Sequence, residues 1–222
     1  MKTMKTLLAA SVAAASMTMI AAPASADVSA SVGIASTYLW RGYDLGSGTP
    51  AVSGDINYSA GGFTAGIWGS SGDTSAGTEY DLYVGYGVSA GDFSFDITAY
   101  NYNYPSGAGY LGTEETDFFE HTDVVLTVGY GPISFSYYEP VAGPSGYTEY
   151  NYYTLSGSFG AFSVTLGSEE GANGGTNDTY HIDLSYAYND NLSFTVSQQD
   201  DDEDLVDTDP KFIVSYSLPI SM

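Results

Sequence analysis

The chain has 222 residues, of which 27 are acidic and four basic, for a formal net charge of −23. This excess of acid argues against nucleic-acid binding, because phosphate contacts need lysine and arginine, and against a basic patch for anionic lipid. The chain has no cysteine, so an exported form must draw its stability from a large core or a closed sheet.

The first 26 residues have the pattern of a cleaved secretory signal. Two lysines precede an uncharged apolar run (7–20), and small residues at 24–26 form an A-x-A cleavage site. The run is short and rich in alanine for a spanning helix, and a retained anchor is the alternative. We therefore expect residues 1–26 to be a signal peptide and residues 27–222 to form one domain.

An alternation of apolar and polar residues dominates the rest of the chain, as in β-strands with one apolar face. Twelve segments show it, and none shows the 3.6-residue period of an amphipathic helix. In chain order, the apolar faces span residues 28–40, 52–58, 63–67, 80–88, 93–99, 124–130, 133–137, 153–159, 162–166, 180–188, 192–196 and 212–222.

The connections between these segments alternate in length. The short ones have hairpin-turn compositions, and the long ones carry or border most of the acidic residues. Short turns at one end and long loops at the other are typical of an outer-membrane β-barrel. The short connections are 59–62, 89–92, 131–132, 160–161 and 189–191; the long ones are 44–49, 70–78, 105–121, 139–147, 169–178 and 200–210.

These patterns predict an all-β fold, a transmembrane antiparallel up-and-down barrel of about 12 strands with short periplasmic turns and longer acidic extracellular loops. A soluble β-sandwich also alternates. However, its edge strands would usually carry protective charges, which the first and last segments lack. Closing the sheet by pairing those two segments removes the exposed edges.

Three stretches resemble the TorF-type porins of proteobacterial outer membranes: "STYLWRGYDLGSGTPAVSGDINY", "GGFTAGIWGSS" and "EYDLYVGYGVSAGDFSFDITAYNYNYP". The shared features are Trp40-Arg41-Gly42, Pro50-Ala51, Trp68-Gly69 and "DLYVGY", all within residues 36–104. The resemblance implies an outer-membrane barrel with a porin role. Two departures are "AVSGD" in place of the family's glutamine after the Pro-Ala pair, and Met222 in place of a terminal aromatic residue.

Arg41 is expected to point into the barrel, because it follows Trp40 on a strand whose apolar face includes Tyr38 and Trp40. That apolar pair would form a lipid-facing rim, with residues 44–49 as the first outer loop. Arg41 would either line a passage or brace the interior through a salt bridge with Asp55 or another acid. By the same parity the candidate lumen and selectivity residues are Arg41, Asp55, Asp81, Asp96, His181, Asp183 and Lys211.

Two further groups are weaker candidates for binding. Tyr100, Tyr102 and Tyr104 share the inward parity and could stack on a sugar or aromatic solute. An acidic run offers oxygen ligands for calcium, but it lacks the D-x-D-x-D-G spacing of an EF-hand. The run is Asp200, Asp201, Asp202, Glu203 and Asp204.

No catalytic motif stands out. The chain has two histidines, His121 and His181, and neither a G-x-S-x-G nor an H-E-x-x-H pattern. We therefore predict a non-enzymatic barrel without a cofactor, which passes small hydrophilic solutes and prefers cations. Its partners would be outer-membrane lipid and the barrel-assembly machinery. The alternative is a closed barrel whose acidic loops serve adhesion, protection or cation binding.

Overall fold

The computed structural model describes residues 26–106, 121–143, 150–171 and 177–221. The expected signal peptide lies outside these residues, save for Ala26. So do parts of three expected long connections, 105–121, 139–147 and 169–178. None of the described residues belongs to a helix long and apolar enough to cross a membrane.

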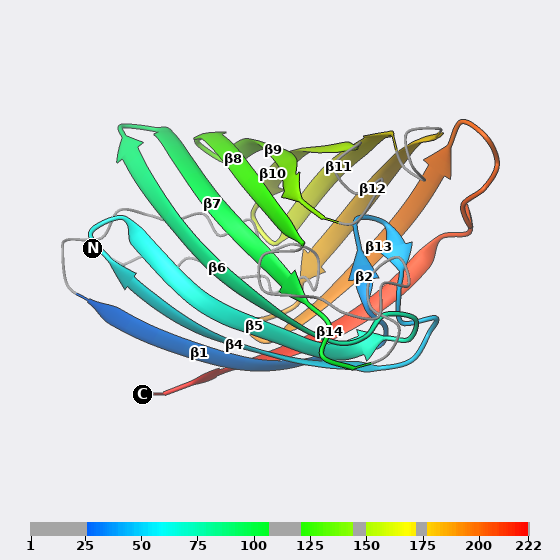
Figure 1. Cartoon of the computed structure of the whole chain (residues 1–222), viewed down its shortest axis with the longest axis horizontal. Coiled ribbons are helices and arrows are strands. Elements are labelled where there is room, and N and C mark those ends of the chain that lie inside the picture. The colour runs from blue at the N-terminus through cyan, green and yellow to red at the C-terminus, as the bar shows by residue number, and fades with distance from the viewer. Residues whose placement is uncertain (1–25, 107–120, 144–149, 172–176, 222) are drawn as a thin grey trace.

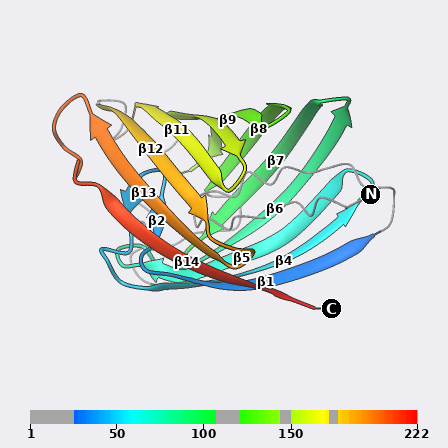
Figure 2. The ribbon, with the colours of Figure 1, turned by 180° about the vertical axis from the view of Figure 1, so that it is seen from behind.

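Twelve antiparallel strands of the described chain form a closed barrel, in which each strand pairs with its neighbour in sequence order (Figures 1 and 2). The first and last strands close it, with register from Ala30 opposite Ile220 to Ala35 opposite Ser215. The predicted fold is therefore confirmed. The strands are β1 (Asp27–Ala35), β4 (Ala51–Ala60), β5 (Phe63–Asp73), β6 (Gly77–Ala90), β7 (Phe93–Asn103), β8 (Thr122–Tyr130), β9 (Ile133–Ala142), β10 (Asn151–Phe159), β11 (Phe162–Gly171), β12 (Asn177–Ala187), β13 (Leu192–Asp201) and β14 (Lys211–Ile220).

Two short strands stand apart from the barrel. β2 (Leu39–Trp40) pairs with β3 (Tyr43–Asp44) in a small hairpin of its own. The first strand was expected to run through residue 40, but β1 ends at Ala35. Figure 1 shows this hairpin toward the end of the barrel that lies opposite the start of β1 and the C-terminal end of β14.

The short turns follow the prediction. Gly61, Gly91, Gly131 and Gly160 each open a two-residue turn between paired strands, with φ between 56° and 64°. A positive φ at this position matches the right-handed twist of the flanking strands, and glycine adopts it without a steric cost.

The connection 70–78 was expected to be long, and this is wrong. β5 continues to Asp73 and β6 begins at Gly77, so only three residues (74–76) join the strands. The Asp73 carboxylate accepts hydrogen bonds from the backbone N–H groups of Ser75 and Ala76 at 2.8 and 2.6 Å, which closes the turn. The connection 202–210 between β13 and β14 is long, as expected.

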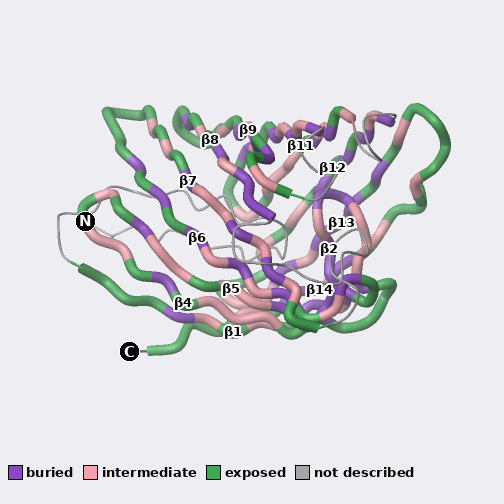
Figure 3. Tube along the Cα trace, viewed as in Figure 1, coloured by how far each residue is buried: buried purple, intermediate pink, exposed green. Residues whose placement is uncertain are grey.

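The barrel is apolar outside and polar inside. Large outward side chains are about half exposed, for example Val84, Ile97 and Leu184 at 47%, 50% and 53%. Inward positions such as Ser136 and Ser197 are buried, and burial alternates along strands such as β6 and β12 (Figure 3). A soluble sandwich would bury the apolar face in a two-sheet core, so this arrangement is the reverse of a soluble fold.

Candidate functional site

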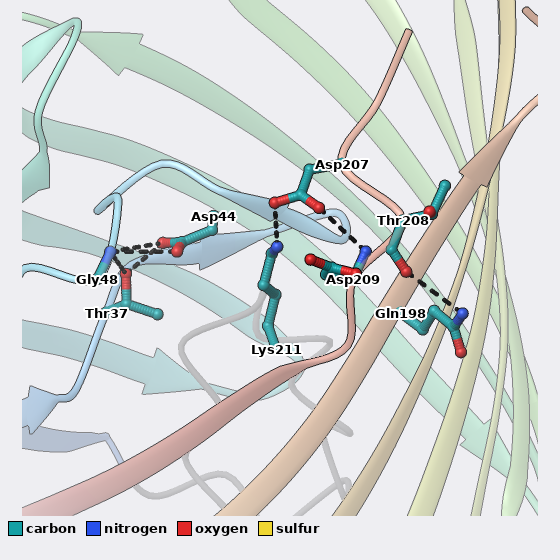
Figure 4. A network of polar contacts seen from close by, with 8 residues as sticks. All are labelled: Thr37, Asp44, Gly48, Gln198, Asp207, Thr208, Asp209 and Lys211. Atoms are coloured by element: carbon teal, nitrogen blue, oxygen red, sulfur yellow. Dashed lines mark hydrogen bonds and ion pairs between the residues drawn. The ribbon is translucent and has the colours of Figure 1, made fainter. Parts of the chain in front are cut away.

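The chain leaves the barrel wall after β1 and turns into the lumen as the β2–β3 hairpin. Ser36 anchors the turning point to β14, because its N–H donates to the Val214 carbonyl at 2.9 Å and its Oγ accepts from the Val214 N–H at 3.0 Å. Asp44 then draws the segment together by accepting hydrogen bonds from the Thr37 hydroxyl and the Gly48 N–H (Figure 4). This departure from the wall brings the hairpin tip into the barrel.

Tyr38 and Trp40 therefore do not form a lipid-facing rim, and that expectation is wrong. Tyr38 is 4% exposed, and its hydroxyl donates to Glu79 Oε2 at 2.8 Å. Trp40 packs against the Arg41 guanidinium. Parity counted from β1 fails here because the strand has already ended. The expectation for residues 44–49 stays a prediction: residues 47–49 are exposed, and the Leu45 carbonyl accepts from the N–H of Thr74, in the turn between β5 and β6, at 3.1 Å.

Arg41 lies at the tip of the hairpin and pairs with two acids from the opposite wall. Its Nη2 donates to Asp123 Oδ2 at 2.8 Å, its Nη1 donates to the Tyr150 hydroxyl at 3.1 Å, and Nη1 lies 3.9 Å from Glu169 Oε2. Arg41 is 3% exposed and Asp123 is fully buried. A buried guanidinium needs such pairing, and here one cation faces two carboxyl groups.

Aromatic rings surround the same guanidinium. The Arg41 Cζ atom lies 4.3 Å from the Trp40 ring centroid, 4.4 Å from that of Tyr152, 5.1 Å from that of Tyr138 and 5.6 Å from that of Tyr150. All four distances fall within the range of cation–π attraction, which is stronger where water is excluded. We call Asp123, Glu169, Tyr138, Tyr150 and Tyr152 the Arg41 cage.

His181 lies on the wall next to the hairpin tip, where it is close to Gly42. Its Nε2 lies 2.8 Å from the Tyr152 hydroxyl and its Nδ1 lies 3.3 Å from Asp183 Oδ1. The imidazole passes between two glycines: a Cβ on Gly42 would lie 2.6 Å from His181 Cβ, and one on Gly167 would overlap the ring. Gly42 also has a φ of 85°, which side chains rarely adopt.

Replacing Gly167 with valine is expected to destabilise the barrel by about 1–3 kcal/mol, because the new side chain overlaps His181. Urea titration of the refolded protein measures the change. Gly54→Ala is the control, since a Cβ there meets only the Ser31 carbonyl at an ordinary 3.5 Å. Equal stability of the two variants would show that His181 moves aside freely.

A second polar cluster surrounds Glu79. Its Oε2 accepts from Tyr38 at 2.8 Å and its Oε1 accepts from Tyr104 at 2.9 Å. Asp81 is the next inward residue on β6 and is 8% exposed. The hairpin therefore contacts acids on two sides of the lumen, through Tyr38 and through Arg41.

The structure places the three candidate stacking tyrosines among protein groups. Tyr102 stacks on Tyr100 with ring centroids 6.4 Å apart, and its hydroxyl donates to Asp123 Oδ2 at 3.2 Å. Tyr104 donates to Glu79. Stacking on a solute stays a prediction.

Asp55 and Asp96 lie away from Arg41. Asp55 accepts from the Tyr83 hydroxyl at 2.8 Å, and Asp96 accepts from the Thr98 hydroxyl at the same distance. The bracing partner of Arg41 is thus Asp123 rather than Asp55.

Lys211 lies at the start of β14 and pairs with Asp207 in the preceding loop (Figure 4). The hydrogen bond from Lys211 lowers the pKa of the Asp207 carboxyl. Asp207 is largely exposed, and exposed pairs contribute little to stability.

We therefore expect Lys211→Ala to leave the urea midpoint of the barrel unchanged within error. A clear drop in the midpoint, measured beside wild type, would show that this pair closes the long loop and contributes to stability.

The acidic run 200–204 is partly used in local structure. Asp201 Oδ2 accepts from the Leu205 N–H and from Asn177 Nδ2, both at 2.8 Å. Within the described ranges, no group of three or more His, Cys, Asp or Glu side chains could hold a metal ion. The run has no ligand cluster to support the calcium hypothesis.

The sequence pattern did not identify four members of the cage: Asp123, Glu169, Tyr150 and Tyr152. A usable signal was present for the two acids. Asp123 precedes the outward residue Val124, and Glu169 continues the inward parity of β11, so both face the lumen. The pattern does not single them out, because both lie at or beside an expected long connection.

Comparison with known proteins places this barrel in a family. The sequence matches the family described as "Bacterial protein of unknown function (Gcw_chp)" over residues 20–211. The chain belongs to the Gcw_chp family. The TorF-type resemblance is not part of this match and stays a prediction. None of the curated proteins matches the chain.

One solved structure shares the fold of this Gcw_chp protein. A structure described as "Unveiling the Mechanism Behind the in-meso Crystallization of Membrane Proteins" is 11% identical, covers 87% of this chain and 83% of its own, and has a TM-score of 0.57. This likeness shows the fold alone. The KdgM porin is also 11% identical, with 88% and 99% of the two chains covered and a TM-score of 0.47.

Proposed function

We propose that this protein is a channel of the bacterial outer membrane for passive diffusion of small hydrophilic solutes, with a preference for cations. The observation that carries the proposal is the closed barrel with an exposed apolar exterior and a polar interior. Such a surface suits a bilayer, where each backbone group must be paired within the protein. The precursor would carry the signal peptide 1–26, and the barrel-assembly machinery would insert residues 27–222 into lipid.

The cation preference is supported by the charges of the inward residues. Lumen residues tune selectivity in such barrels, and rings of carboxylates favour cations. Arg41 is the single arginine of the chain, and Lys211 lies at the start of β14 beside the long loop. The carboxyl groups on the inward faces of the strands belong to Asp55, Glu79, Asp81, Asp96, Asp123, Glu169 and Asp183.

One observation favours a second candidate, a closed barrel whose acidic loops serve adhesion, protection or cation binding. The inward hairpin fills part of the lumen, and Tyr38, Leu39 and Arg41 on it are buried. If the hairpin stays in place, it narrows or closes the passage.

Planar-bilayer recording separates the two candidates. We expect discrete conductance steps. In a KCl gradient, the reversal potential should have the same sign as the equilibrium potential of potassium. Heat-modifiable gel mobility establishes that the inserted protein is a folded barrel. A folded protein without steps would favour the closed barrel, and an anion-selective reversal potential would contradict the cation preference.

A further inference from the structure

We infer that the Arg41 cage is a binding site for small planar organic cations of the guanidinium class, and that Arg41 is its built-in occupant. The inference concerns binding inside the barrel. It goes beyond the proposed channel and does not depend on conductance.

The cage is built by the wall and does not depend on the hairpin. Asp123, Tyr138, Tyr152 and Glu169 come from the neighbouring strands β8, β9, β10 and β11, and Tyr150 directly precedes β10. Contacts among wall residues hold it: the Tyr138 and Tyr152 rings lie 5.0 Å apart. The hydroxyl of Tyr102 also donates to Asp123 at 3.2 Å. These contacts do not involve Arg41, so Arg41→Ala does not remove them.

The chemistry of the cage selects a flat cation. Aromatic faces attract a guanidinium by stacking and cation–π contact, while the carboxylate of Asp123 accepts from its N–H fork. A compact ammonium is more strongly hydrated and offers no plane to stack. Glu169 at 3.9 Å is a second acid, so two carboxyl groups face one cation.

Arg41, the occupant of the cage, lies on a hairpin whose strands do not pair with the barrel sheet. β2 and β3 have two residues each and pair with each other, not with a wall strand. The tip residues Arg41 and Gly42 both have positive φ, 49° and 85°. A non-glycine residue in this region is uncommon and is held there by its surroundings. The cage contacts are therefore among those that hold the tip in place, together with His181 beside Gly42.

The test uses the refolded full barrel with Arg41→Ala and guanidinium chloride as the probe. Concentrations stay in the millimolar range, far below denaturing ones, and KCl keeps the ionic strength constant. The readout is tryptophan fluorescence, since Trp40 lies against the site and Trp68 is the other tryptophan. We expect a saturable change in Arg41→Ala and none in wild type, where Arg41 occupies the cage.

Two further variants make the result specific. In Arg41→Ala/Asp123→Asn, guanidinium should bind about tenfold more weakly, because the charged acceptor is lost. Lys211→Ala removes the same charge from an exposed pair, and guanidinium should not change the tryptophan fluorescence of this variant. The inference would be overturned if KCl alone produced the same fluorescence change in Arg41→Ala. It would also be overturned if adding Asp123→Asn to Arg41→Ala left guanidinium binding unchanged.

If Arg41→Ala refolds poorly, the yield becomes the readout. Millimolar guanidinium in the refolding buffer should then increase the folded band on a heat-modifiable gel, and no increase over KCl would overturn the inference. Bilayer recording is separate: saturable binding without conductance supports the cage and contradicts the channel.

Discussion

Replacing Arg41 with alanine is expected to increase the cation selectivity and the unitary conductance of the proposed channel. The substitution leaves Asp123 and Glu169 in the lumen without their shared cation and removes a large side chain from the hairpin tip. Charges interact strongly where water is limited. A change of about 1 kcal/mol in the relative barriers for cation and anion corresponds to about fivefold in the permeability ratio.

The reversal potential in a KCl gradient measures this ratio. Lys211→Ala is the matched control, since it also removes one positive charge, but from an exposed pair with Asp207. If Arg41→Ala changes the reversal potential no more than Lys211→Ala does, Arg41 does not line the ion path and its role is structural.

Replacing Asp123 with alanine is expected to reduce the free energy of unfolding by about 3–5 kcal/mol, the usual cost of breaking a buried ion pair by removing one partner. The guanidinium of Arg41 would stay buried with only Glu169 at 3.9 Å as an acid partner. The Tyr102 hydroxyl would also lose its acceptor. Urea titration of the refolded barrel measures the loss.

A double-mutant cycle separates the pair from its surroundings. Arg41→Ala/Asp123→Ala should be more stable than the sum of the two single losses predicts, because no unpaired charge stays buried. Asp207→Ala is the control for an exposed pair and should leave stability unchanged. Strictly additive losses at Arg41 and Asp123 would show that the two side chains stabilise the barrel independently.

The alternation of apolar residues was enough to predict the barrel, its number of strands and the faces of its long strands. It was not enough to find where the backbone leaves the wall. Apolar residues continue the pattern through Tyr38 and Trp40, but the strand ends at Ala35, Tyr38 is buried and Trp40 packs on the Arg41 guanidinium. Side-chain parity reports a face only while the backbone stays in the ladder.

The partner of Arg41 could not be read from local pattern for a different reason. Asp123 is 82 residues away along the chain, and only closure of the barrel brings β8 opposite the hairpin. Sequence parity predicts that both residues face inward. Their distance depends on barrel circumference, strand stagger and the depth to which the hairpin enters.

The seam between β1 and β14 also orders the events of folding. Ser36 is bonded to Val214 across 178 residues, at the point where the hairpin departs from the wall. Contacts of such sequence separation form slowly, because loop closure must precede them. The sheet can close only after its last strand is made, so the bonds at Ser36 that fix where the hairpin departs are expected among the last to form.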